Sequence, residues 1–248
     1  MKKKGLTLAE VLITLSIIGV VAALTLPTLQ SSVYKSKVGP ALRKFIATME
    51  VANEHVLTEQ DSNNLNIVVS DESKNTKQYL DELGKFVKGA TEQTVGFTPK
   101  TLQSINIQSY SGTNYSIDEA SKYLIFNLEA GDSMGIRVLT RAQQQEFKPT
   151  GSIKYNGSYK GIFADVWYDL NGIGTGPNRL GVDIFYFYID KSGSLIPYGG
   201  KLMYNSGYKS NADEWKNGPD RCNATTVNTG KSCAGSVADN NWKVLYKY

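Results

Sequence analysis

Apolar residues near the start of the chain form an almost unbroken run. From Leu6 to Leu26 the carboxylate of Glu10 is the only ionisable group. An apolar helix of about 20 residues is long enough to span the hydrocarbon core of a bilayer. The run therefore predicts a transmembrane helix over residues 6–26.

After Pro27 the apolar residues become periodic. Polar residues such as Lys44, Glu50 and Asn53 separate apolar ones that recur at steps of three and four, the pattern of an amphipathic helix over 35–58 with one buried face. We predict one long helix over 6–58. Packing on the protein's own core is the favoured interpretation and a coiled-coil partner the alternative, because heptads are not sustained. The apolar stripe consists of Val38, Leu42, Phe45, Met49, Ala52 and Val56.

The pattern of the remaining residues, 59–248, predicts a globular head. Residues 70–90 have helical spacing with capping residues at their start. Later runs are rich in Ile, Val, Phe and Tyr and are separated by Gly, Asn, Asp and Pro, which is typical of antiparallel strands and turns. Residues 190–193 predict a hairpin turn. A long helix packed on a C-terminal antiparallel sheet is an α+β fold. The predicted strands are "KYLIFNL", "MGIRVL", "GIFADVWYDL", "VDIFYFYI" and "WKVLYK".

Most of the net positive charge of the chain comes from its first residues. Lys2, Lys3 and Lys4 supply three of the net +4 charges, so the rest is nearly neutral and indicates no nucleic-acid surface. By the positive-inside bias, these lysines place the start of the apolar run in the cytoplasm and the head outside it. The lone His55 has no serine or cysteine partner placed by a motif, so we do not expect an enzyme.

Glu10 is the most informative residue of the apolar run. A carboxylate at the centre of a transmembrane helix costs about 2.5 to 3.5 kcal/mol, less toward an end, and indicates a functional site with a partner. An uncleaved signal anchor or a cleaved secretory signal would explain the run but not the carboxylate. A cut after Gly5 would give Leu6 a new ammonium group one helical turn from Glu10, which could pair with it on the same or a neighbouring chain.

The stretch "KKKGLTLAEVLITLSIIGVVAALTLP" resembles the class III signal of type IV pilins and of the related type II secretion pseudopilins. In that family a short basic leader ends in Gly, cleavage follows directly, Glu lies five residues into the mature chain and the apolar helix is retained. The resemblance implies that 1–5 is a cytoplasmic leader, Gly5 precedes the cut, Leu6 is the mature N-terminus and Glu10 sets the register of assembly. The family usually has Phe where this chain has Leu6.

The same resemblance implies a structural subunit, a pseudopilin or pilin with a pilin-like head. It would be anchored by one pass through the inner membrane and its lipid bilayer, cleaved by a prepilin peptidase and then N-methylated. An inner-membrane assembly platform would add it to other pilin or pseudopilin subunits in a helical filament. Two alternatives are a membrane-anchored extracytoplasmic binding domain, and a pilus adhesin or DNA-uptake subunit. Alternating tyrosines such as Tyr186, Tyr188 and Tyr198 are more typical of sheet packing than of an adhesive surface.

Cys222 and Cys233 lie close together in a polar segment. In an exported head such a pair predicts a disulfide, whereas in a reducing compartment it would be a pair of incidental thiols or a partial metal site.

The Gly-rich segment 164–183 is the candidate metal site. It carries the oxygen donors Asp165, Asp169, Asn171 and Asp183, and Ca²⁺ takes six to eight oxygen ligands. Some type II secretion pseudopilins hold calcium in a C-terminal loop, so the resemblance adds support for calcium without identifying its ligands. The alternative is that these side chains form turns. The glycines of this segment lack the lysine and the following helix of a phosphate loop.

Overall fold

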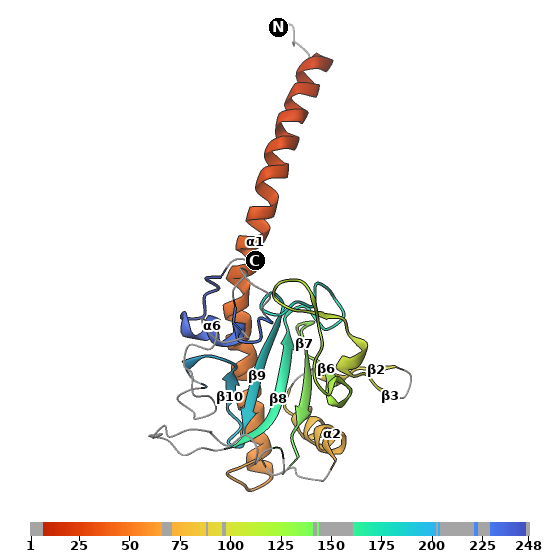
Figure 1. Ribbon diagram of the computed structural model, residues 1–248, viewed down its shortest axis with the longest axis vertical. Coiled ribbons are helices and arrows are strands. Elements are labelled where there is room, and N and C mark those ends of the chain that lie inside the picture. Colours follow the sequence, from red (N-terminus) through yellow and green to blue (C-terminus); the bar gives the residue numbers. More distant parts are fainter. Residues whose placement is uncertain are drawn as a thin grey trace, which may run out of the picture. The chain divides into compact units, whose positions relative to one another are not determined.

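The computed structural model describes residues 7–65, 71–87, 89–95, 98–140, 143, 161–201, 203, 221–222 and 229–246. The chain has two compact units, residues 1–37 and residues 38–248. The long helix α1 (Leu8–Glu59) begins in the first unit and ends in the second (Figure 1). The division into leader, helix and head over 1–5, 6–58 and 59–248 stays a prediction.

From Leu8 to Leu26 helix α1 carries Glu10 as its single charged residue, and by length and composition the helix can cross a membrane. Hydroxyl groups within this part donate to carbonyls of the preceding turn. Ser16 Oγ lies 2.9 Å from the Leu12 carbonyl oxygen, and Thr25 Oγ1 lies 2.9 Å from that of Val21. Because lipid offers no hydrogen-bond partner, this back-bonding lets polar side chains remain in an apolar span.

The second unit is built on a six-stranded antiparallel sheet, which confirms the predicted α+β fold with a pilin-like arrangement of long helix and sheet. The strand order is β1-β6-β7-β8-β9-β10. The predicted hairpin turn joins β9 to β10, where Ile189 pairs with Leu195. The strands are β1 (Thr91–Glu92), β6 (Leu124–Asn127), β7 (Ser133–Val138), β8 (Ile162–Asp169), β9 (Ile184–Asp190) and β10 (Leu195–Pro197).

One face of this sheet is covered by α1 and by α2 (Glu72–Leu83) (Figure 1). Every residue of the predicted apolar stripe on α1 is buried, so the core interpretation of the stripe is confirmed. Phe45 stacks on Tyr168 with ring centroids 3.9 Å apart and meets Phe187 edge-on. On α2, Tyr79 packs edge-on against Phe163 of β8.

Asn53 lies among the polar positions of α1 but is completely buried. Its Nδ2 donates to the Gly193 carbonyl at 2.7 Å, in the β9–β10 turn, and its Oδ1 accepts a hydrogen bond from the Tyr79 hydroxyl. A buried amide needs partners, and here they come from α2 and from the sheet. This one side chain therefore joins three elements.

The opposite face of the sheet carries a second apolar cluster. Trp167, Tyr186, Tyr188 and Tyr198 are buried on it, so these three tyrosines pack in the core, as expected. Residues 102–117 contribute to this cluster through the 3-10 helix η1 (Leu102–Ser104) and the hairpin of β4 (Ile107–Gln108) and β5 (Asn114–Tyr115).

The strand predicted for "WKVLYK" is wrong. Its described residues, 242–246, follow helix α6 (Cys233–Asp239), and the Trp242 backbone amide donates to the Val237 carbonyl at 2.8 Å, so this part closes the helix instead of extending a sheet. Asn241 and Trp242 have positive φ values, 54° and 61°, which a strand does not allow. A side chain at Gly39 of α1 would collide with the Trp242 carbonyl.

Candidate functional site

The first candidate site lies at the start of α1, where Thr7 and Glu10 bond reciprocally. Glu10 Oε2 accepts hydrogen bonds from the Thr7 amide at 2.7 Å and from the Thr7 hydroxyl at 2.8 Å. The Glu10 amide donates in return to Thr7 Oγ1 at 3.3 Å. This Thr-x-x-Glu arrangement is a capping box, which satisfies amides that a helix N-terminus leaves without partners.

The capping box occupies only one of the two carboxylate oxygens of Glu10. Within the part of the chain that the structure describes, no hydrogen bond reaches Oε1 and no cation pairs with the carboxylate. Gly5 and Leu6, the predicted cleavage residues, lie outside the described residues. The Thr7 contact was not predicted, although a Thr-x-x-Glu spacing directly before an apolar run is a known sequence pattern for it.

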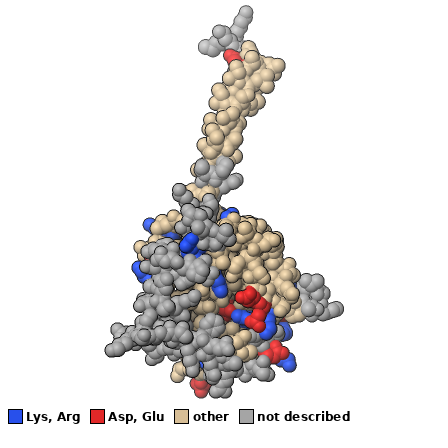
Figure 2. Space-filling model, in the orientation of Figure 1, with Lys and Arg blue, Asp and Glu red and all other residues tan. Residues whose placement is uncertain are grey.

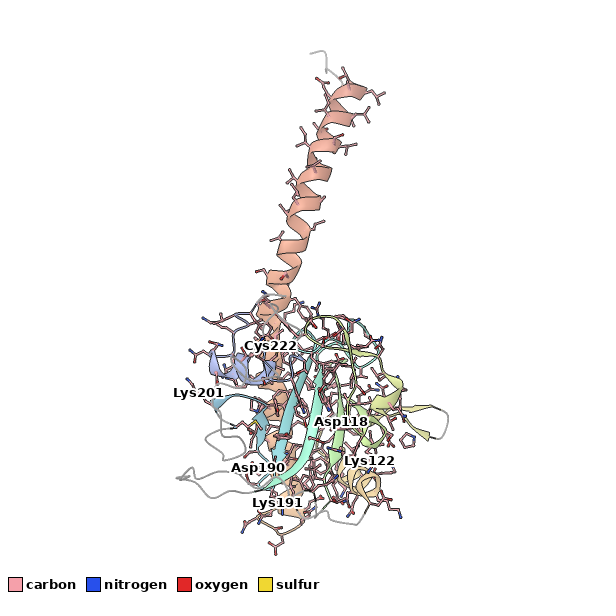
Figure 3. All side chains as sticks on the ribbon, in the orientation of Figure 1. Asp118, Lys122, Asp190, Lys191, Lys201 and Cys222 are labelled. Carbon is pink, nitrogen blue, oxygen red and sulfur yellow. A yellow bond between two sulfur atoms is a disulfide. The ribbon has the colours of Figure 1, made fainter. Side chains whose placement is uncertain are left out.

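Cys222 and Cys233 form a disulfide in the second unit, with their Cα atoms 5.0 Å apart. Cys233 begins α6, and its sulfur lies where a side chain at Gly181 would stand; Gly181 has a φ of 74°. Because only glycine fits here, the disulfide can lie directly against the turn before β9. Figure 3 shows Cys222 beside α6.

Asp165 does not join the other three predicted calcium ligands. It accepts hydrogen bonds from Arg137 Nη2 at 2.8 Å, from the Tyr123 hydroxyl at 2.8 Å and from the Tyr186 hydroxyl at 3.1 Å. Asp165 is 1% exposed, so it forms a buried ion pair with Arg137. The two tyrosine hydroxyls satisfy the remaining hydrogen-bond acceptor positions of its carboxylate. The role of Asp165 is therefore to neutralise Arg137 beneath the second face of the sheet.

Asp169 and Asp183 lie at the same end of β8 and β9, and Asn171 follows Asp169 in the turn. Asp169 Oδ1 accepts a hydrogen bond from the backbone amide of Asn171 at 3.0 Å. Asp183 accepts one from the backbone amide of Asn178 at 2.8 Å. These bonds are of the turn-forming kind that was the alternative to a metal site. Among the described residues, no group of three or more His, Cys, Asp or Glu side chains is arranged to hold a metal ion.

Two buried oxygen atoms in this turn nevertheless lack a hydrogen-bond partner in the described structure, Asp169 Oδ2 and Asn171 Oδ1. Burial, together with the charges of Asp183 and Asp132, raises the pKa of Asp169 to about 7, against the opposing effect of the Asn171 and Gly172 amides. Burial also raises the pKa of Asp183. The turn is thus a place where negative charge is costly without a partner.

Comparison with known proteins identifies the N-terminal segment. Residues 1–26 match the family model described as the prokaryotic N-terminal methylation motif. No curated protein and no solved structure matches the chain. The long apolar N-terminal helix followed by an antiparallel sheet is a pilin-like architecture. The matched segment is the prepilin-type cleavage and methylation signal of type IV pilin-like proteins, a structural family, and the resemblance is confirmed.

The raised pKa of Asp169 predicts a pH-dependent stability. Its folded pKa of about 7 exceeds the unfolded value of about 3.9, so the folded state binds the extra proton and loses stability as pH rises from about 4 to about 7. The Asp169→Asn variant removes this ionisation and keeps an oxygen for the Asn171 amide. Between about pH 5 and about pH 8 the unfolding free energy of the unmodified protein should fall, and that of Asp169→Asn should fall by a smaller amount. The difference between the two should be roughly 1 to 3 kcal/mol.

Urea unfolding followed by circular dichroism at both pH values measures this difference. Asp118→Asn, at an exposed carboxylate labelled in Figure 3, is the matched control and should behave as the unmodified protein does. If Asp169→Asn and the unmodified protein lost equal unfolding free energy between the two pH values, the raised pKa of Asp169 would be contradicted.

Proposed function

We propose that this protein is a structural subunit of a helical filament of the type II secretion or type IV pilus kind, a pseudopilin or pilin. Its precursor is cleaved after Gly5 by a prepilin peptidase, and the mature chain is assembled from the inner membrane by an assembly platform. One observation carries the proposal: a single carboxylate, Glu10, at the start of a membrane-length apolar helix within the matched signal.

The proposed assembly step is the pairing of Glu10 with the ammonium group at Leu6 of a neighbouring subunit. In a lone subunit Thr7 satisfies Oε2 by hydrogen bonding, but a hydroxyl and an amide leave the charge uncompensated. Two opposite charges about 4 Å apart attract by about 4 kcal/mol at an effective dielectric constant of about 20. That attraction is of the same size as the cost of the carboxylate in lipid.

The apolar surface of α1 supplies the remaining contact between subunits in this proposal. Leu12, Ile13 and Ile17 are among side chains that are more than half exposed in the single chain. Such residues are compatible with lipid, and van der Waals packing associates helices within a membrane. Charge pairing would then set the register of neighbouring helices, and packing would add to the stability of the filament.

Processing predicts a particular mature N-terminus. Protein purified from its own membranes should begin at Leu6, with or without one added methyl group, because the matched signal is one for cleavage and methylation. Intact mass and N-terminal sequencing measure this. A chain that still begins at Met1 would contradict the filament subunit and favour the membrane-anchored binding domain.

Replacing Glu10 separates its charge from its hydrogen bonds. Glu10→Val should leave membrane insertion intact and abolish filament assembly. Glu10→Gln keeps an oxygen that can accept the Thr7 amide and hydroxyl but has no charge, so it should also fail to assemble. Thr7→Val, which removes the hydroxyl and keeps the charge, is the matched control and should retain assembly at a reduced level.

Assembly is scored by electron microscopy and by the subunit recovered in sheared filaments, and insertion by membrane fractionation. If Glu10→Gln assembles as well as the unmodified protein, hydrogen bonding to Thr7 explains the carboxylate and charge pairing is wrong.

We further propose that the turn after β8 binds Ca²⁺ through Asp169, Asn171 and Asp183, without Asp165. The unpartnered oxygens of Asp169 and Asn171 support this reduced ligand set. Millimolar calcium chloride should raise the melting temperature, and more at about pH 8 than at about pH 5, because a ligating carboxylate must be deprotonated. Magnesium chloride, which prefers rigid octahedral sites, should have a smaller effect. An unchanged calcium effect in the variant carrying both Asp169→Asn and Asp183→Asn would exclude this site.

A further inference from the structure

A pocket of about 530 Å³ opens on the second unit between η1, the β4–β5 hairpin and the 3-10 helix η2 (Ala120–Lys122). This volume is within the range of about 300 to 1,000 Å³ found for small-molecule sites. Its floor is apolar, since Leu102, Ile107 and Ile117 are buried, and Ile105 and Tyr115 form half-buried walls. An apolar floor with a few polar groups around it is the usual composition of a ligand site.

The rim of the pocket offers hydrogen-bonding groups that the fold does not use. Gln103, Asn114, Ser116 and Ser121 line the pocket and are exposed. Among the residues that the structure describes, no hydrogen bond engages any of these four side chains. Two carboxamides and two hydroxyls can both donate and accept, so the rim suits a ligand with several donors and acceptors.

The charged group at the pocket is already neutralised. Glu119 pairs with Arg137 and, at 3.3 Å, with Lys122. Burial raises the pKa of Glu119, but the contacts with Lys122 and Arg137 lower it by more, so the carboxylate is ionised at neutral pH. A carboxylate with two cationic partners leaves little field to attract either a cation or an anion.

Two neighbouring segments contain no charged residue, although the flanking Arg179 lies near Gly112 and Lys100 lies near Gly174. Segments 101–117 and 170–178 contain no Lys, Arg, Asp or Glu, and they are joined where the Gln108 amide donates to the Asn178 carbonyl at 2.9 Å. Figure 2 shows an uncharged area beside the charged group around Asp118 and Lys122, which Figure 3 labels. The site is therefore suited to a neutral ligand.

Tyr115 provides the aromatic wall. Its ring lies 6.0 Å from that of Trp167, between centroids, so a buried indole supports it from the core side. Rigid aromatic side chains supply contact area at low entropic cost, and Ser, Asn and Gln supply adaptable hydrogen bonds around them. A sugar ring presents the complementary surfaces, with apolar C–H groups on its face and hydroxyls along its edge.

We propose that this pocket binds a neutral saccharide of one or two sugar units, with the sugar face against Tyr115 and its hydroxyls bonded to the amides of Gln103 and Asn114. The ionised Glu119 accepts from further hydroxyls. The site lies wholly in the second unit, so binding does not require filament assembly, and failure of either proposal leaves the other standing.

Saturation-transfer NMR on the full chain, in a detergent without sugar head groups, tests this proposal. The probes are methyl β-glucoside, methyl β-galactoside, N-acetylglucosamine and its β-1,4 disaccharide, with glucuronate as the charged comparison. We expect at least one neutral probe to bind in the millimolar range or tighter, with its ring C–H protons most strongly saturated. Absence of binding by all four neutral probes, or tighter binding of glucuronate, would overturn the proposal.

Variants of the lining residues test whether the sugar that gives the NMR signal binds in this pocket. Gln103→Ala and Asn114→Ala should each weaken binding about threefold to tenfold, the usual effect of losing one hydrogen bond. Gln78→Ala, at an exposed amide on α2, is the matched control and should bind normally. Tyr115→Phe should retain binding and Tyr115→Ala should lose it, at melting temperatures that show both variants to be folded. Equal binding by the unmodified protein and the Gln103→Ala/Asn114→Ala variant would place the sugar elsewhere and exclude this site.

Discussion

Burial of one stripe of α1 against the sheet is the interaction on which the second unit depends. Val38, Phe45 and Met49 are buried, and Phe45 packs on Tyr168 of β8 and Phe187 of β9. Burial of such side chains contributes about 1.5 to 3 kcal/mol each. The first part of the same helix is a membrane-length apolar run whose large side chains are exposed in the single chain. A helix of that kind requires lipid or other apolar helices around it. The two parts of α1 thus require different surroundings, which fits membrane anchoring.

Local patterns in the sequence predicted those parts of the fold that depend on nearby residues. The periodicity of α1, the main strands of the sheet and the turn between Asp190 and Ser194 are all set by spacings of a few residues. Helix α6 was missed and a strand was assigned after it, because Trp242 closes the helix through Val237 and approaches Gly39 from the far end of the chain. Contacts of this kind leave no periodic signature.

The candidate sites show the same limit. The position of Glu10 in the apolar run was sufficient to mark it, and its bond to Thr7 was accessible from a local spacing. Asp165 could not be separated from Asp169 by sequence, since its partner Arg137 lies on a neighbouring strand. The periodicity of α1 places Asn53 among the polar positions, but the side chain is buried because its partner Gly193, 140 residues away, packs against it. A polar residue is assigned correctly only when its hydrogen-bond partner is known, because burial without one is costly.

The chemistry of the molecule is divided between its two units. Glu10 and the methylation motif lie in residues 1–37, where the surroundings are apolar and one charge is a large perturbation. The pocket beside Tyr115 lies in residues 38–248, where Arg137 and Lys122 neutralise Glu119 and leave uncharged amides and hydroxyls around the pocket. In the first unit the charge of Glu10 has no cationic partner among the described residues, and the proposed assembly supplies one from another chain. In the second, compensated charge favours a neutral ligand, so substitutions can test the proposed assembly and the proposed recognition independently.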